Sequence, residues 1–100
     1  MEKKIVEKSM ILIVEQNLIA SKVREINDKA QNFIEEIEKF ETIILDIKDV
    51  SYIDSVGITF IVAMYKIVSK QNKEFKLINT NEDIKDLFAL MRLNEKFSIE

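Results

Sequence analysis

The chain has 100 residues, of which 47% are hydrophobic and 33% charged, and we expect a single folded domain over residues 1–100. It contains no cysteine and no histidine, which excludes disulfides, the usual zinc sites and Cys–His or Ser–His–Asp catalytic groups. The formal net charge of −3 argues against nucleic acid as a direct partner. Because no apolar run approaches the roughly 20 residues that span a bilayer, and no secretory signal follows Met1, we expect a cytoplasmic protein without a membrane segment.

The first half of the chain predicts a β-hairpin, a helix and a buried strand. The hairpin strands are the apolar segments Lys4–Glu7 and Met10–Glu15. Apolar residues then recur every three or four positions over Ser21–Phe40, which predicts an amphipathic helix lying on a sheet. Thr42–Ile47 is rich in β-branched residues and predicts a central strand, with a loop over Lys48–Asp54 after it.

Helix and strand alternate again in the second half. A helix is expected after Ser55, a strand over Glu74–Asn79, and a last helix capped by Asn81, with Glu82 and Asp83 in its first turn. This order predicts an α/β fold with a small mixed β-sheet, opened by the N-terminal hairpin and continued by right-handed parallel crossovers, with helices packed against it.

The helix after Ser55 is unusual because it carries no charge from Val56 to Tyr65. At about 100° per residue its apolar side chains form two stripes. One contains Ile58, Ile61, Val62, Tyr65 and Val68, and the other contains Val56, Phe60, Ala63, Met64 and Ile67. The second stripe packs either on the Ser21–Phe40 helix, which we favour, or on a partner protein.

Ser55 and Gly57 stand at the junction between the central strand and this helix. Ser55 is suited to be the N-cap of the helix. Its hydroxyl is also placed beyond the carboxyl end of a central strand, where a phosphate would meet helix N–H groups, although Asp54 opposes a second negative charge. Gly57 is the only glycine, and either close packing on the preceding strand or the approach of another molecule's backbone accounts for it.

The acidic residues after the strands do not predict an enzyme. Asp46 is interpreted as a solvated carboxylate at a strand end and Asp49 as a turn former. A receiver-type phosphoacceptor role for Asp46 needs an acidic metal-binding cluster, and Glu15 is the one further carboxylate expected nearby. No catalytic residue, metal or cofactor is therefore expected.

Residues 42–62, TIILDIKDVSYIDSVGITFIV, carry a recognisable pattern. A strand ends in Asp46-Ile47-Lys48, the pair Tyr52-Ile53 follows, and Asp54-Ser55-Val56-Gly57-Ile58 forms a turn into a helix. This pattern resembles the signature of the STAS domain, as found in bacterial anti-sigma factor antagonists, also called anti-anti-sigma factors. The resemblance extends over almost the whole chain.

The resemblance implies that Ser55 is the phosphoacceptor of a protein that is both an anti-sigma factor and a serine kinase of histidine-kinase-like ATPase fold. The unphosphorylated form would bind this kinase and release the sigma factor, and a metal-dependent serine phosphatase would reverse the modification. Asp54, Ser55, Val56, Gly57 and Ile58 would form the docking surface. The alternative is a non-switched STAS scaffold in another bacterial signalling complex, with Ser55 only capping the helix.

Four residues, in three places, depart from the family pattern. Gln16-Asn17 stands where members often have Gly followed by Asp or Glu, Val56 where Ser, Thr or Ala is commoner, and Arg92 where Gly is frequent. The acidic contact of other members is therefore not transferred to Asn17, and the bulk of Arg92 is expected to alter the surface near the end of the chain.

Overall fold

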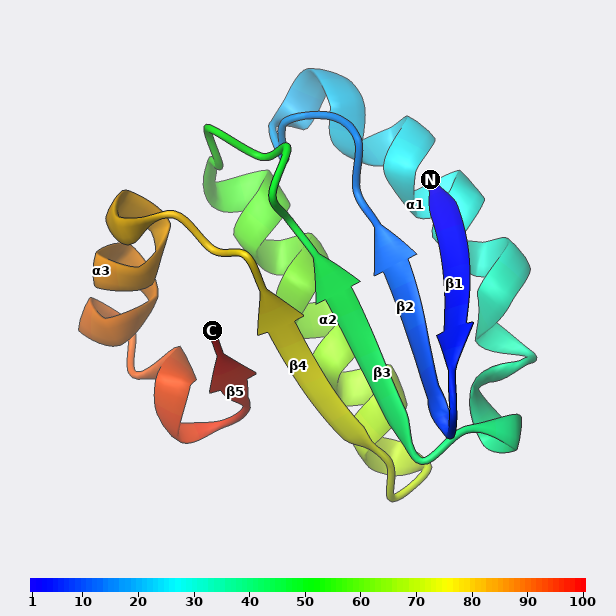
Figure 1. Cartoon of the computed structure of the whole chain (residues 1–100). Helices are drawn as coiled ribbons and strands as arrows, with labels where there is room; N and C mark the ends of the chain where they lie inside the picture. The colour runs from blue at the N-terminus through cyan, green and yellow to red at the C-terminus, as the bar shows by residue number, and fades with distance from the viewer.

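Five strands form one mixed sheet whose spatial order, β1-β2-β3-β4-β5, follows the chain (Figure 1). The computed structural model describes all 100 residues. The strands are β1 (Glu2–Val6), β2 (Ser9–Ile13), β3 (Thr42–Asp46), β4 (Glu74–Ile78) and β5 (Ser98–Ile99). The helices are α1 (Ala20–Ile34), α2 (Ser55–Lys70) and α3 (Glu82–Leu90), with short 3₁₀ helices over Ile37–Lys39 and Leu93–Glu95.

The strand pairing confirms the predicted α/β architecture. β1 pairs with β2 antiparallel, and every later pair is parallel, with a helix in each connection. The register places Ile11 of β2 beside Ile44 of β3, and Ile44 beside Lys76 of β4. α1 and α2 therefore both begin beyond the carboxyl ends of parallel strands, at one end of the molecule (Figure 1).

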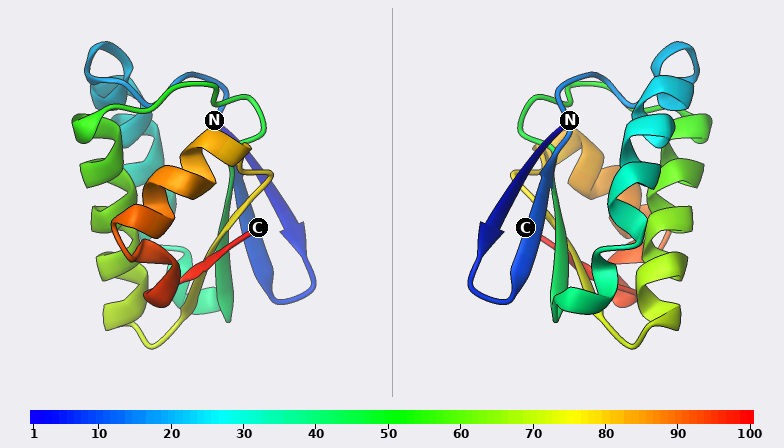
Figure 2. Two further views of the ribbon diagram at one scale, coloured as in Figure 1. Left: turned by 90° about the vertical axis from the view of Figure 1, so that its left-hand side faces the viewer. Right: turned by 90° about the vertical axis from the view of Figure 1, so that its right-hand side faces the viewer.

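The hydrophobic core lies between the sheet and the helices. Alternate strand residues are fully buried on the helix side, namely Met10, Leu12, Ile43, Leu45, Phe75 and Leu77. α1 and α2 cover this face side by side, whereas α3 lies beyond β4 toward the edge of the sheet (Figures 1 and 2). The opposite face carries no helix, and its central residues Ile11, Ile44 and Lys76 are half-buried (Figure 1). The Cα radius of gyration is 12.4 Å, close to the ~13 Å typical of a domain of this length.

The long helix predicted over Ser21–Phe40 is wrong at its C-terminal end. α1 stops at Ile34, and a separate 3₁₀ turn then buries Ile37. Glu35, Glu36 and Glu38 surround the break, and carboxylates are unfavourable at the negative end of a helix dipole, which explains the early stop. The two-residue strand β5 was not predicted, because so short a segment carries no periodic pattern.

The second apolar stripe of α2 is divided between the core and the surface. Phe60 is 4% exposed and Met64 2%, and α1 contacts α2, so the favoured packing of this part on the first long helix is confirmed. Val56 is 43% exposed, and Ala63 is exposed as well. The outer part of the stripe is therefore not covered by any element of the chain.

Candidate functional site at the start of helix α2

Asp54, and not Ser55, caps helix α2. The backbone of Asp54 is extended, and its Oδ1 atom accepts hydrogen bonds of 3.0 Å from the backbone N–H groups of both Val56 and Gly57. The expected capping role of Ser55 is therefore corrected, since Ser55 is already the first helical residue. A carboxylate at this position also interacts favourably with the positive end of the helix dipole.

The same carboxylate binds the start of helix α1. The Oδ2 atom of Asp54 accepts a 2.7 Å hydrogen bond from the backbone N–H of Ala20, and Ile19, which precedes α1, offers no side-chain cap. The N–H of Gly57, followed by that of Ala20, lowers the pKa of Asp54 below its ordinary value. One ionised side chain thus joins the N-termini of the two helices that cover the sheet.

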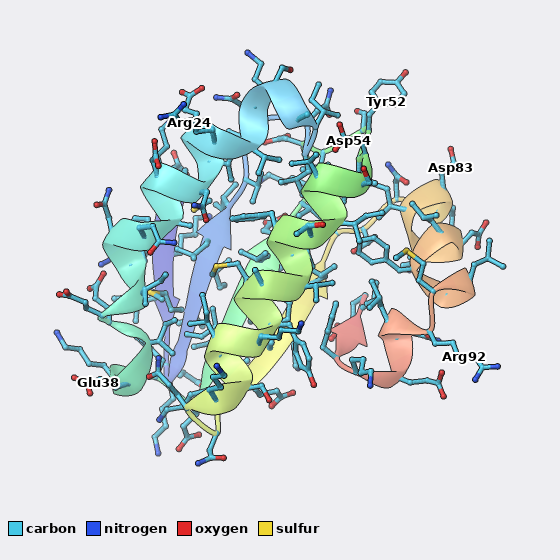
Figure 3. All side chains as sticks on the ribbon, turned by 180° about the vertical axis from the view of Figure 1, so that it is seen from behind. Arg24, Glu38, Tyr52, Asp54, Asp83 and Arg92 are labelled. Carbon is cyan, nitrogen blue, oxygen red and sulfur yellow. The ribbon has the colours of Figure 1, made fainter.

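Ser55 is exposed, and its hydroxyl has no hydrogen-bonding role within the fold. Its backbone carbonyl accepts a 2.9 Å hydrogen bond from the Thr59 hydroxyl, but its side chain is not used as a cap. Two large apolar side chains near it in the chain are also exposed, Tyr52 at 71% and Val56 at 43%. Figure 3 shows Tyr52 and Asp54 at the end of the molecule where α2 begins.

Gly57 is required by the chain's own backbone. A Cβ atom at this position would lie 1.9 Å from the carbonyl oxygen and 2.7 Å from the carbonyl carbon of Leu18. Close packing within the chain therefore accounts for this glycine, but the contact is with Leu18 of the β2–α1 connection and not with the preceding strand. No foreign backbone is needed to explain it. Ile58, the last residue of the predicted docking surface, is half-buried and packs against the core.

Two asparagines hold the loop that leads to Ser55. The Oδ1 atom of Asn17 accepts hydrogen bonds from the backbone N–H groups of Ser51, at 2.8 Å, and Tyr52, at 3.2 Å. Asn81 caps α3 as predicted, and its Nδ2 group also donates to the carbonyl oxygens of Val50 and Ser51. These loop contacts could not be predicted from the sequence, because nothing in the local pattern around either asparagine indicates a partner at least 30 residues away.

The family model for the STAS domain matches residues 1–100. The chain belongs to the STAS domain family. The crystal structure of TM1081 from Thermotoga maritima, a candidate anti-sigma factor antagonist, is similar with a TM-score of 0.86 and 25% identity, over 98% of this chain and 83% of that one. The anti-sigma factor antagonist SpoIIAA in its unphosphorylated form gives a TM-score of 0.70 at 16% identity, over 99% and 86%. The phosphorylated form of SpoIIAA, a Bacillus cell fate determinant, gives 0.71 at 16%, over 99% and 89%.

Two departures of this STAS domain from the family pattern, at Asn17 and Arg92, have local explanations. Asn17 uses a side-chain oxygen as acceptor, which a carboxylate at this position could also do, so the loop contact does not depend on charge. Arg92 has a φ of 58°, in the left-handed region that favours glycine. The glycine common in other members thus fits the backbone conformation that Arg92 adopts here.

The remaining acidic residues of this STAS domain do not form a second site. Asp46 is 7% exposed, and its Oδ1 atom accepts hydrogen bonds from the Lys48 N–H, at 3.1 Å, and the Asn79 Nδ2 group, at 3.0 Å. The expectation of a solvated Asp46 is therefore wrong, because Asn79 covers it. Asp49 lies in a turn, as expected. Glu15 pairs with the amino group of Met1 at 2.9 Å, and no group of three acidic side chains is placed to hold a metal ion. No helix of the chain combines the length and hydrophobicity needed to cross a membrane.

Proposed function

We propose that this STAS domain is an anti-sigma factor antagonist of the cytoplasm whose binding is switched off by phosphorylation of Ser55. Its partner would be an anti-sigma factor that is also a serine kinase of histidine-kinase-like ATPase fold. Binding of the unphosphorylated form to that partner releases the sigma factor. A metal-dependent serine phosphatase restores the binding form, and the domain itself catalyses no reaction.

The observation that carries this proposal is that Asp54 caps helix α2 and leaves the Ser55 side chain exposed. Because Asp54 takes the capping role, the Ser55 hydroxyl is exposed and free to accept a phosphoryl group without loss of a structural hydrogen bond. Its neighbours Tyr52 and Val56 expose apolar surface suited to a protein partner. The resemblance to SpoIIAA, known in unphosphorylated and phosphorylated forms, supports the same switch.

The geometry also explains why a phosphate would act on binding more than on folding. The N–H groups of Val56 and Gly57 already donate to Asp54, so a phosphate on Ser55 would remain at the surface, where it adds a charge of about −1.5 to −2. At an interface this group would have to lose its water beside the Asp54 carboxylate. An uncompensated buried charge costs several kcal/mol, and a hundredfold loss of affinity requires only about 2.7 kcal/mol.

The test uses the purified chain and the kinase-fold anti-sigma proteins encoded by the same genome, each with ATP and Mg²⁺. The phosphate is mapped by mass spectrometry, and the affinity of both forms is measured by calorimetry. We expect one kinase to modify Ser55 and to bind the modified form at least about a hundredfold more weakly. Ser55→Ala should bind and resist modification, and Ser55→Asp should bind poorly.

Ser51→Ala is the matched control, because Ser51 is exposed in the same loop and donates only its backbone N–H to Asn17. This variant should be modified like the wild type. Phosphate found only at another residue, or equal affinity of the two forms, would contradict the switch. Binding without modification would instead favour the non-switched scaffold.

A further inference from the structure

Helices α1 and α2 enclose an apolar surface groove of about 360 Å³ next to the proposed phosphorylation site. The apolar part of its lining includes Val23 of α1 and Val56, Phe60 and Ala63 of α2. Phe60 is buried, whereas Val56 is 43% exposed and Ala63 is exposed. The groove thus contains the outer part of the α2 stripe that the chain itself leaves uncovered.

The exposed residues of α2 run as a continuous stripe away from Ser55. Thr59, Ala63, Lys66 and Lys70 follow it at intervals of three or four residues, and all are exposed. α2 contains no acidic residue, although the chain as a whole carries a net charge of −3. The exposed stripe of α2 that begins at Ser55 therefore carries small uncharged side chains at Thr59 and Ala63 and lysines further along, at Lys66 and Lys70.

Arg24 of α1 is the one charged residue that lines the groove. Figure 3 shows it on the part of α1 that lies toward the end of the molecule where α2 begins. The ion pair within α1 joins Lys29 to Glu25, and Arg24 has no carboxylate partner. A partner that covered this guanidinium with apolar surface alone would bury an unpaired charge, which is unfavourable. A carboxylate can instead bind the guanidinium through two parallel hydrogen bonds.

We propose that this groove receives an acidic amphipathic helix of the anti-sigma factor kinase. An apolar side chain of that helix would fill the groove over Val23, Val56 and Ala63, and a neighbouring carboxylate would pair with Arg24. This inference rests on the proposed function and names the chemistry of its partner. It also explains how Ser55 controls docking, because a phosphate at the end of the stripe repels an acidic segment over the Debye length of about 8 Å at physiological salt.

The experiment measures the affinity of the purified, unphosphorylated chain for the kinase-fold anti-sigma protein that binds it. Arg24→Glu is compared with Lys22→Glu, which makes the same charge change on an exposed residue of α1 that does not line the groove. Ala63→Trp, which fills the groove, is compared with Ser69→Trp at an exposed position of α2 outside it. Circular dichroism verifies that all four variants fold.

We expect Arg24→Glu and Ala63→Trp each to weaken binding at least about tenfold, and both controls to stay within about threefold of the wild type. A Lys substitution at one acidic residue of the kinase should restore binding to Arg24→Glu. Equal effects of Arg24→Glu and Lys22→Glu, or an unaffected Ala63→Trp, would overturn the groove while leaving the switch at Ser55 standing.

Two other occupants of the groove, a second copy of this chain and a small molecule, would give different experimental results. Self-association of the chain in sedimentation velocity that Ala63→Trp abolishes would assign the groove to a second copy and overturn the inference. Unchanged kinase binding by Ala63→Trp, together with displacement of an apolar dye from the groove, would assign it to a small molecule. If no kinase-fold protein binds the wild-type chain, the proposed function fails first and the inference fails with it.

Discussion

The carbonyl oxygen of Leu18 occupies the space that a side chain on Gly57 would need, 1.9 Å from an ideal Cβ position. In an ordinary helix Ala is more stable than Gly by about 1 kcal/mol, but here the added methyl group meets backbone that cannot rotate away. We therefore expect Gly57→Ala to lower the free energy of unfolding by about 1–3 kcal/mol in urea titrations. Ser69→Ala, at an exposed position of the same helix, should change it by no more than about 0.5 kcal/mol. A Gly57→Ala protein as stable as the Ser69→Ala control would show that Leu18 moves freely.

The role of Asp54 predicts a specific pH dependence. Hydrogen bonds from Gly57 and Ala20 lower its pKa in the folded state, so the stabilisation it provides is complete above the unfolded-state pKa of about 3.9. As the pH falls further, through the lower folded-state pKa, this stabilisation is lost. The difference in unfolding free energy between wild type and Asp54→Asn should therefore be constant above about pH 5 and shrink as the pH falls below the unfolded-state pKa of about 3.9.

The titration of Glu15 does not disturb that comparison. The amino group of Met1 lowers the pKa of Glu15 too, and its contribution falls in the same acidic range. Because Glu15 is present in both proteins, its effect cancels from the difference. A difference that stays constant across the acidic range would mean that the Asp54 carboxylate is not held as the structure shows.

Ser55→Ala should have little effect on folding. The hydroxyl is exposed and caps nothing, so the expected change in unfolding free energy is within about 0.5 kcal/mol. Asp54→Ala should cost clearly more, because it removes three hydrogen bonds to backbone N–H groups of two helices. Thermal and urea unfolding of the two variants side by side measures this. If the two variants lost the same free energy of unfolding, Ser55 would contribute as much to the start of α2 as Asp54, and the assignment of Asp54 as the cap would be wrong.

Arg92→Gly should stabilise the protein. Arg92 has a φ of 58°, and left-handed backbone costs a residue with a side chain about 1–2 kcal/mol. Glycine avoids this cost but makes the unfolded chain more flexible, so we expect a net gain of about 0.5–1 kcal/mol in the free energy of unfolding. Arg92→Ala keeps the strained conformation and should bring no gain. If alanine stabilises as much as glycine, the effect comes from loss of the arginine side chain and not from the backbone.

The periodic elements of this fold could be predicted from the sequence because their signals are local. The hairpin, the central strand and the two-striped helix each depend on residues within one segment, and the burial of Phe60 and Met64 follows from the spacing of α2. The early end of α1 could not be predicted in the same way. Ile37 continues the helical apolar period, and only the competition between that pattern and the glutamates around it decides where the helix stops.

The roles of the site residues could not be predicted from the sequence, for a different reason. Asp54 and Ser55 are both good caps, and the sequence cannot decide between them, because the choice depends on which residue is still extended when the loop reaches α2. The reason for Gly57 is Leu18, 39 positions earlier, and Asp46 is covered by Asn79, 33 positions later. Such relationships exist only after the sheet has brought separate segments together.

The three-point attachment of the loop before Ser55 determines what a modifying enzyme can recognise. Asn17 and Asn81 bind backbone groups of this loop from two separate segments. Asp54, within the loop, accepts hydrogen bonds from the backbone N–H groups of Ala20, Val56 and Gly57. An enzyme cannot draw this turn out as an extended peptide without breaking those bonds, so it has to engage the turn as it stands. On the proposed function, the kinase would therefore recognise Ser55 by tertiary structure and not by its neighbours in the chain, and a synthetic peptide of the same residues would be a poor substrate. Loss of folding would therefore abolish phosphorylation of Ser55 together with partner binding, and it would not leave the chain permanently in the binding form.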